Sequence, residues 1–459
     1  MTSRSKRPLY DALKAYAALE PARFHMPGHK GSLFGFDVTE VDGTDNLSAP
    51  TGPILKLEEL CSAAFHSKEA LISVGGSTAA NIAMLLSLGL NKRVLLTRNC
   101  HCSVINGMAL AGHTAFLLDT DGFGIVTPEA VDAALKIAPC DAVFITSPTY
   151  RGLACDVAGI AEAAHAHGAL LLVDCAHGAH FAFGSRLPAV PVFADMWCVS
   201  CHKTLEALNQ TALLCIGASS PHGKEKVRRA LRMVQTTSPS YPLMLSIEQA
   251  IACPSDWDGH CERLDKFKDA LLGISGIRLL EQGTAFESDP TRLNISAEGL
   301  TGYELADLLI KKRVYPEMSD SECVTLITAP SDREEWYFML YDALREAALP
   351  EKGTSSFNHA SMPEKAYCAH GIDIRAAVLC ESESLPLDLS CGRVCAGAVG
   401  IYPPGTALLF PGEAISSEAI RIIAPSITQK AVVLVVNGKS TFMPNMPVIT
   451  VSGRRMVLI

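Results

Sequence analysis

Two segments of the chain place a reactive side chain directly after an apolar run. Lys203 lies in the segment SCHKT at 200–204, which follows the apolar run 195–199. Asp174 follows an earlier apolar run at 169–173. A lysine amine can form a Schiff base with the aldehyde of pyridoxal phosphate, and an aspartate can keep the pyridine nitrogen of that cofactor protonated. Most lysines are solvated surface groups, so it is the pair in this setting that predicts pyridoxal-phosphate chemistry.

A Gly-Ser-Thr segment could bind the phosphate of such a cofactor. Gly76, Ser77, Thr78 and Ala79 follow the apolar run 70–74 and open a helical stretch. Glycine lets the backbone approach a phosphate, and hydroxyls and helix N-terminal N–H groups then bind the anion. An ordinary glycine turn with a Ser or Thr cap would have the same sequence. The segment also lacks the lysine of a P-loop.

Several histidines and one serine follow the same apolar runs. His101 could stack over a planar cofactor, and Ser200 and His202 could add two phosphate contacts beside the lysine. His177 and His180 follow Asp174 with the spacing of a metal-binding HxxH motif. A cofactor ring nearby explains these two histidines equally well, and we expect no metal.

The apolar runs alternate with Ala-rich helical stretches, such as 128–138 and 157–167. Short continuous apolar strands that alternate with helices indicate a mostly parallel sheet covered on both faces. Ligands of such sheets bind outside the carboxyl ends of the strands, where all the residues above are expected to lie. The seven expected strands are 70–74, 93–97, 115–118, 142–146, 169–173, 195–199 and 212–216.

Changes in composition and pattern along the sequence divide the chain into three regions. Residues 1–56 read as an N-terminal arm, with a short amphipathic helix at 8–20 followed by turns. Residues 57–285 form the major α/β domain. Residues 286–459 form a smaller α+β region, with a possible boundary near 350–360. Such a division is expected because 459 residues are too many for one core.

Composition excludes several classes of protein. The net charge of −9 argues against nucleic acid as a partner. Without an 18-residue apolar run or the apolar segment of a secretory signal, we expect no membrane span and a cytoplasmic location. We expect the 16 cysteines to be mostly buried reduced thiols.

On these motifs the chain resembles the Orn/Lys/Arg decarboxylase family, pyridoxal-phosphate enzymes of fold type I, in the short bacterial form without a receiver-like N-terminal domain. The resemblance implies a large, mostly parallel seven-stranded sheet domain and a smaller α+β C-terminal domain. HMPGHKG and TTSPSY are its most discriminating motifs. The segments that carry it are HMPGHKG at 25–31, GST at 76–78, RNCH at 98–101, SPTY at 147–150, AHGAH at 176–180, SCHKT at 200–204, TTSPSY at 236–241, PEM at 316–318 and YPPG at 402–405.

The resemblance also implies roles for individual residues. Lys203 would hold the cofactor aldehyde, Asp174 would pair with the pyridine nitrogen, and His101 would stack on the ring. Thr236 and Ser238 match positions that reach the phosphate in the neighbouring subunit's site, which implies a homodimer or a larger homo-oligomer. The other residues expected around the cofactor are Gly76, Ser77, Thr78, Ala79, Ala176, His177, Ser200 and His202.

The implied reaction is the α-decarboxylation of arginine, lysine or ornithine to agmatine, cadaverine or putrescine. Glu317 would bind the distal cation of the substrate, and His202 or Lys203 would protonate Cα. An aminotransferase or a lyase of the same fold would share the lysine and the aspartate, with Arg292 as the candidate carboxylate ligand of an aminotransferase. A third hypothesis is that the chain is a non-enzymatic protein that kept the fold. One departure is Cys102, where the family usually has lysine, so any role of that lysine is open here.

Overall fold

We analysed a computed structural model of the chain. It describes residues 7–118, 120–121, 123–280, 285–348, 372–401, 406–423, 432–436, 448–451 and 454–458. The YPPG motif at 402–405 and the expected boundary region at 350–360 lie outside these residues.

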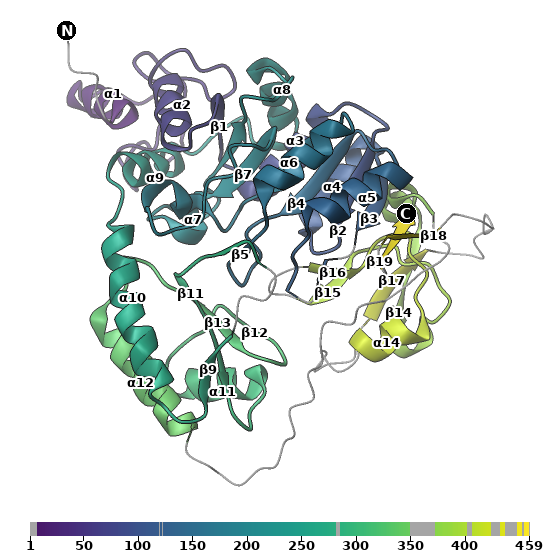
Figure 1. Ribbon diagram of the computed structural model, residues 1–459. Helices are drawn as coiled ribbons and strands as arrows, with labels where there is room; N and C mark the ends of the chain where they lie inside the picture. The colour runs from purple at the N-terminus through teal and green to yellow at the C-terminus, as the bar shows by residue number, and fades with distance from the viewer. Residues whose placement is uncertain are drawn as a thin grey trace.

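The main element of the molecule is a sheet of nine strands (Figure 1). Five neighbouring strands are parallel, β8 is antiparallel to its neighbours, and β1 closes that edge. The order is β1 (Glu69–Ser73), β8 (Ala212–Ile216), β7 (Met196–Ser200), β6 (Leu170–Asp174), β4 (Ala142–Thr146), β2 (Arg93–Thr97), β3 (Thr114–Leu118), β19 (Arg454–Leu458) and β18 (Val448–Val451). The expected sheet is confirmed. Two C-terminal strands, which the sequence did not place there, extend it beyond β3.

Alternate residues of each strand enter two different cores. In β2, Leu95 packs on one side of the sheet, whereas Val94 and Leu96 pack on the other. This is why the strands are apolar throughout rather than alternating. One face is covered by α2 (Pro53–Ala64), α5 (Pro128–Ile137), α6 (Val157–Ala166) and α9 (Tyr241–Ala252), and the other by α3 (Gly76–Ser87), α4 (Cys102–Ala111) and α8 (Lys224–Val234).

The N-terminal helix α1 (Pro8–Ala18) is anchored to the major domain at its first turn. The N–H groups of Leu9 and Tyr10 donate to the carboxylate of Glu248, at 2.6 and 2.9 Å. Leu13 of the expected amphipathic helix is buried, but Leu19 is 75% exposed because the helix ends at Ala18. The arm continues into α2, which crosses the expected boundary at 56.

A second sheet lies below the first and has its own core. It is formed by β12 (Met318–Ser319), β13 (Val324–Ile327), β11 (Arg292–Ala297) and β9 (Ile277–Leu279). The helices α10 (Trp257–Leu272), α11 (Gly302–Lys311) and α12 (Glu334–Ala347) pack with it. Because Leu264 and Leu271 of α10 belong to this core, the unit draws on residues well before 286. A two-stranded ladder of β5 (Leu153–Ala154) and β10 (Glu287–Ser288) links it to the major domain.

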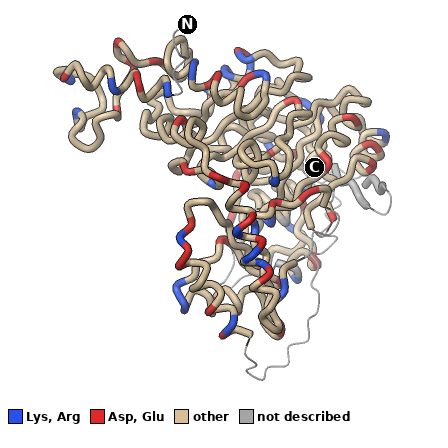
Figure 2. The backbone as a smooth tube through the Cα atoms, turned by 60° about the vertical axis from the view of Figure 1, so that its left-hand side comes forward, with Lys and Arg blue, Asp and Glu red and all other residues tan. Residues whose placement is uncertain are grey.

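The C-terminal region lies on the β3 side of the large sheet. Most of it shares a third core, whereas Ile374 packs into a core of the large sheet. The elements of this region are α13 (Ile374–Leu379), β14 (Ser382–Pro386), the 3₁₀ turn Leu387–Leu389, β15 (Val399–Ile401), β16 (Thr406–Leu409), α14 (Ser417–Ile423) and β17 (Val432–Val436). Arg98, at the carboxyl end of β2, reaches this region and pairs with the buried Glu413 at 3.0 Å. Acidic and basic residues are interspersed over the backbone (Figure 2).

Breaking the Arg98–Glu413 pair should loosen the C-terminal region. We expect Glu413→Ala to lower the free energy of unfolding by about 3 kcal/mol, because the variant leaves a largely buried guanidinium without its carboxylate. Lys136→Ala is the control, since it breaks an exposed pair with Asp132 that should contribute less than about 0.5 kcal/mol. Urea unfolding measures both, and equal losses would contradict the assignment.

The junction between α10 and the second sheet predicts a pH dependence of stability. The imidazole of His260 is buried and lies 3.0 Å from the hydroxyl of Thr328, and burial lowers its pKa to about 4. Between that value and the unfolded pKa of about 6.5, only the unfolded state binds the proton, so stability falls as pH falls.

Between pH 7 and pH 5, we expect the free energy of unfolding of His260→Gln to fall by about 2 kcal/mol less than that of the wild type. The exposed His66 gives the control variant His66→Asn, which should keep the wild-type slope. Urea unfolding at several pH values measures the slopes, and an unchanged slope in His260→Gln would contradict the prediction.

Candidate active site

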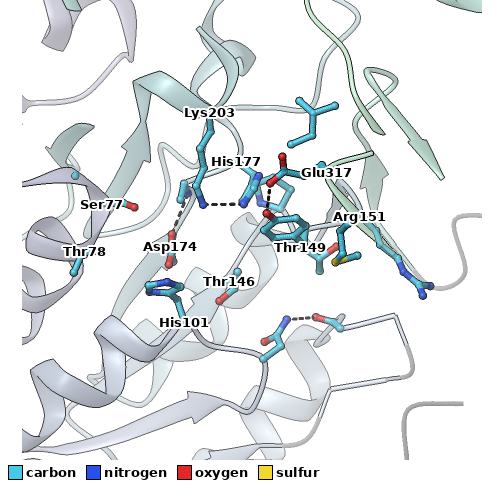
Figure 3. Close-up of a pocket in the computed structure, with 18 of the residues that line it drawn as sticks. Ser77, Thr78, His101, Thr146, Thr149, Arg151, Asp174, His177, Lys203 and Glu317 are labelled. Atoms are coloured by element: carbon cyan, nitrogen blue, oxygen red, sulfur yellow. Dashed lines mark hydrogen bonds between the residues drawn. The ribbon is translucent and has the colours of Figure 1, made fainter. Parts of the chain in front are cut away.

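A pocket of about 790 Å³ opens at the carboxyl ends of the parallel strands (Figure 3). Its walls come from the turns after β1, β2, β4, β6 and β7 and from β12 of the second sheet. The structure therefore brings most of the sequence-predicted residues together. Those that line the pocket are Gly76, Ser77, Thr78, His101, Asp174, Ala176, His177, His202, Lys203 and Glu317.

Lys203 lies in the short helix α7 (Cys201–Thr204) that follows β7. Its Nζ is 2.9 Å from Nε2 of His177, and burial lowers the pKa of the lysine. Burial also lowers the pKa of His177 well below its usual value. A neutral imidazole accepts a hydrogen bond from the lysine, so His177 holds Nζ in the pocket. Figure 3 shows the two side chains meeting above Asp174.

Asp174 ends β6 and is buried at the floor of the pocket. One carboxylate oxygen accepts the backbone N–H of Ala176 at 3.0 Å. The other accepts the side-chain amide of Asn81 at 2.7 Å. These donors satisfy a carboxylate that burial alone would penalise.

His101 precedes α4 and serves as its N-cap, with Nδ1 accepting the backbone N–H of Ser103. Burial lowers its pKa, so the ring is neutral near pH 7. Cys102 is exposed, and its sulfur lies 3.7 Å from Nε2 of His101. At the position where the family usually has lysine, this chain thus places a thiol beside the ring.

The turn from β1 to α3 forms the opposite wall. Gly76 has a φ of +70°, a conformation that favours glycine. Ser77 and Thr78 line the pocket in the first turn of α3, whose N-terminus has no side-chain cap. Ser200 lies behind them and its hydroxyl is 2.8 Å from that of Ser77. This arrangement fits a phosphate group.

The remaining residues expected near the phosphate have other surroundings. Nδ1 of His202 contacts the carbonyl of Thr211 at 3.0 Å, and Ala79 is buried within α3. Thr236 and Ser238 are exposed and are not among the residues that line this pocket.

Tyr150, which the sequence motifs contain but to which no role was assigned, is central to the pocket. Its ring lies 4.4 Å from that of His177, and its hydroxyl donates to the carboxylate of Glu317. Arg151 follows and pairs with Asp320 and Glu322, at 2.5 and 3.1 Å. Glu317, Asp320 and Arg151 all line this side of the pocket, where three carboxylates, those of Glu317, Asp320 and Glu322, face one guanidinium.

Other polar residues of the pocket gave only weak sequence signals. Asn99 and Thr146 line it and follow or end strands, which is the one feature that could have singled them out. Oδ1 of Asn99 and Oγ1 of Thr146 are buried and have no hydrogen-bond partner among the described residues. Such atoms fit a polar ligand in the pocket.

The HxxH spacing does not build a metal site. His177 faces Lys203, whereas Nε2 of His180 lies 3.0 Å from the carboxylate of Asp289. Among the described residues, no cluster of three or more His, Cys, Asp or Glu side chains could hold a metal. The helices of the described residues include none with the length and apolar character that a membrane span requires.

Comparisons with known proteins agree with this geometry. The profile of the Orn/Lys/Arg decarboxylase major domain matches residues 7–271, and that of the C-terminal domain matches 354–424. An arginine decarboxylase of Bacillus subtilis is 29% identical over 92% of this chain and 94% of its own length. The constitutive lysine decarboxylase of Escherichia coli is 26% identical over 53% of this chain and 40% of its own length.

Solved structures show the same fold. A lysine decarboxylase of Francisella novicida superposes with a TM-score of 0.77 at 16% identity, covering 94% of this chain and 81% of its own. An alanine–glyoxylate aminotransferase of Nostoc gives 0.52 at 14% identity, covering 64% and 85%. The predicted fold-type I architecture is thereby confirmed.

Proposed function

The chain belongs to the Orn/Lys/Arg decarboxylase family, and we propose that it removes the α-carboxylate of arginine with pyridoxal phosphate as its cofactor. As a family member it is a decarboxylase of basic amino acids. Arginine is favoured among them because a curated arginine decarboxylase matches nearly the whole chain, whereas a lysine decarboxylase matches about half of it.

The residues of the pocket fit the proposed cofactor. Pyridoxal phosphate supplies an aldehyde that reacts with amines and a ring that accepts the electrons left when carbon dioxide departs. Lys203 would hold the aldehyde, Asp174 the ring nitrogen, and His101 the face of the ring. Ser77 and Thr78, with the N-terminus of α3, would bind the phosphate.

The observation that carries the substrate proposal is the carboxylate of Glu317 inside the pocket. It lies across from Ser77 and Thr78, where Tyr150 donates to it (Figure 3). A carboxylate fixed in this way can accept two hydrogen bonds from a planar guanidinium. The neighbouring Asp320 is already paired with Arg151, so Glu317 is the carboxylate that we assign to the distal cation of the substrate.

The reaction also needs a proton on Cα after carbon dioxide leaves. We assign it to Nζ of Lys203, since His177 orients this nitrogen at 2.9 Å. The other candidate, His202, directs Nδ1 to the carbonyl of Thr211. His177 stays neutral and therefore does not compete as an acid.

A transamination reaction receives less support. Its candidate carboxylate ligand, Arg292, is buried and is not among the residues that line the pocket. Its guanidinium contacts the carbonyl of His177 at 3.3 Å and the carboxylate of Asp289 at 3.4 Å. An arginine held in this way is already occupied.

We further propose that the active unit is at least a homodimer. Thr236 and Ser238 are exposed, as expected of residues that serve a neighbouring site. The arm also exposes Phe24 to 96% and Leu33 to 83%, and a second subunit would cover such apolar side chains.

Incubation with arginine, lysine and ornithine tests the substrate proposal. With pyridoxal phosphate present, we expect carbon dioxide and the corresponding amine, with kcat/KM for arginine at least about tenfold higher than for lysine, because only the guanidinium binds a carboxylate through two parallel hydrogen bonds. Preference for lysine or ornithine would contradict the choice of arginine. Amino transfer that requires a keto acid and releases no carbon dioxide would contradict decarboxylation.

Two variants test individual residues in that assay, and a third serves as their control. Lys203→Ala should lose turnover and keep its circular dichroism spectrum. Glu317→Gln should raise KM for arginine about tenfold, the cost of one charged hydrogen bond. Glu334→Gln changes an exposed carboxylate at the start of α12 and should match the wild type.

Complementation tests the shared site. We expect mixtures of Lys203→Ala with a Thr236→Ala, Ser238→Ala double variant to regain activity after subunit exchange. If sites are shared, one site of the heterodimer carries both lesions and the other carries neither. Exchange proven by mass without recovered activity, or full activity of a diluted monomer, would contradict the proposal.

A further inference from the structure

A chain of hydrogen bonds runs beneath the pocket and connects two residues that would contact different parts of the cofactor ring. It begins at Asp174, passes through Asn81 of α3 and Ser103 of α4, and ends at His101. Asn81 and Ser103 are buried and do not line the pocket. They therefore act only through the residues that they bind.

Both hydrogens of the Asn81 side-chain amide are used in this chain of hydrogen bonds. Its nitrogen donates to Oδ2 of Asp174 at 2.7 Å and to the hydroxyl of Ser103 at 3.0 Å. Its oxygen lies 3.1 Å from the thiol of Cys198. Burial raises the pKa of that thiol well above its usual value, so Cys198 keeps the hydrogen that it donates.

These partners fix the orientation of the amide. A carboxylate oxygen accepts hydrogen bonds, so the NH₂ group of Asn81 must face Asp174. The reverse orientation would place two oxygen acceptors 2.7 Å apart and leave the Cys198 thiol facing a donor.

The direction of the chain continues to the histidine. The hydroxyl of Ser103 accepts from Asn81, which leaves its single hydrogen free to donate to Nδ1 of His101 at 2.8 Å. The backbone N–H of Ser103 donates to the same nitrogen at 3.1 Å. An imidazole nitrogen that accepts two hydrogen bonds carries no proton, so the hydrogen lies on Nε2.

We propose that Asn81 and Ser103 are positioning residues that tie the carboxylate of Asp174 to the tautomer of His101. This inference rests on the proposed function for its purpose, since Asp174 and His101 matter together only if they hold one cofactor. The geometry itself holds in the protein without cofactor. Asn81 thereby orients the group at the ring nitrogen and, through Ser103, the hydrogen on the stacking ring.

The first test needs no cofactor. The ¹⁵N shifts of labelled histidine in the cofactor-free protein report the protonation of each ring nitrogen, and His101→Gln identifies the signals of this residue. We expect neutral His101 with an excess of the Nε2–H form of at least about fivefold, the effect of one net hydrogen bond. A charged ring or an excess of the Nδ1–H form would overturn the proposal.

A pair of variants then tests the route through Ser103. Asn81→Ala frees the serine hydroxyl to rotate, so the excess of the Nε2–H form should fall about threefold or more. In a Ser103→Ala background, the same asparagine change should leave the His101 shifts where they are. Equal effects in both backgrounds would overturn the proposed route of hydrogen bonds through Ser103. Ser87→Ala, which removes a buried hydroxyl of α3 that contacts Met84 and Met196, should leave His101 unchanged.

Cofactor binding separates this inference from the proposed function. We expect Asn81→Ala to weaken the binding of pyridoxal phosphate about tenfold, measured by fluorescence titration, because Asp174 loses a charged hydrogen bond. Unchanged affinity would overturn the positioning role of Asn81. A wild-type protein that binds no pyridoxal phosphate would defeat the proposed function, while the tautomer measurement would still test the chain.

Discussion

The buried carboxylate of Asp174 is the constraint on which the rest of the site depends. A carboxylate at the end of a central parallel strand loses most of its hydration, and only hydrogen-bond donors from the protein can compensate. The donors come from the backbone of Ala176 and from Asn81 of α3. Satisfying this one group therefore fixes how α3 sits against the carboxyl end of β6.

The same edge of the sheet gathers groups of opposite character. Burial keeps His101 and His177 neutral, while Lys203 contributes a cation and Glu317 an anion. Neutral imidazoles can orient a lysine or cover a ring without adding positive charge to the pocket. A substrate with a carboxylate at one end and a cation at the other meets different partners at each end.

The two smaller units complete the pocket from outside the large sheet. The second sheet supplies Glu317 and Asp320, and the C-terminal region holds Arg98 through Glu413. Arg98 lies in the same turn as Asn99 and His101, so the position of the C-terminal region bears on the wall of the pocket. Motion of the second sheet relative to the large sheet would change the position of Glu317 relative to Lys203.

The sequence by itself determined the seven strands and the residues at their ends. Each strand is buried on both faces, and this produces the continuous apolar runs that mark it. Parallel strands end at one edge, so Asp174, His101 and Lys203 had to converge there whatever the details of packing.

Only the tertiary structure decided which distant segments meet. The hydrogen bond from Tyr150 to Glu317, the pairing of His180 with Asp289 and the packing of α10 in the second core leave no local pattern. Asn81 is equally silent in the sequence, because its role depends on how α3 is rotated toward Asp174 and Ser103. Helix rotation and domain placement follow from packing between segments far apart in the chain, and the periodicity of one segment does not record them.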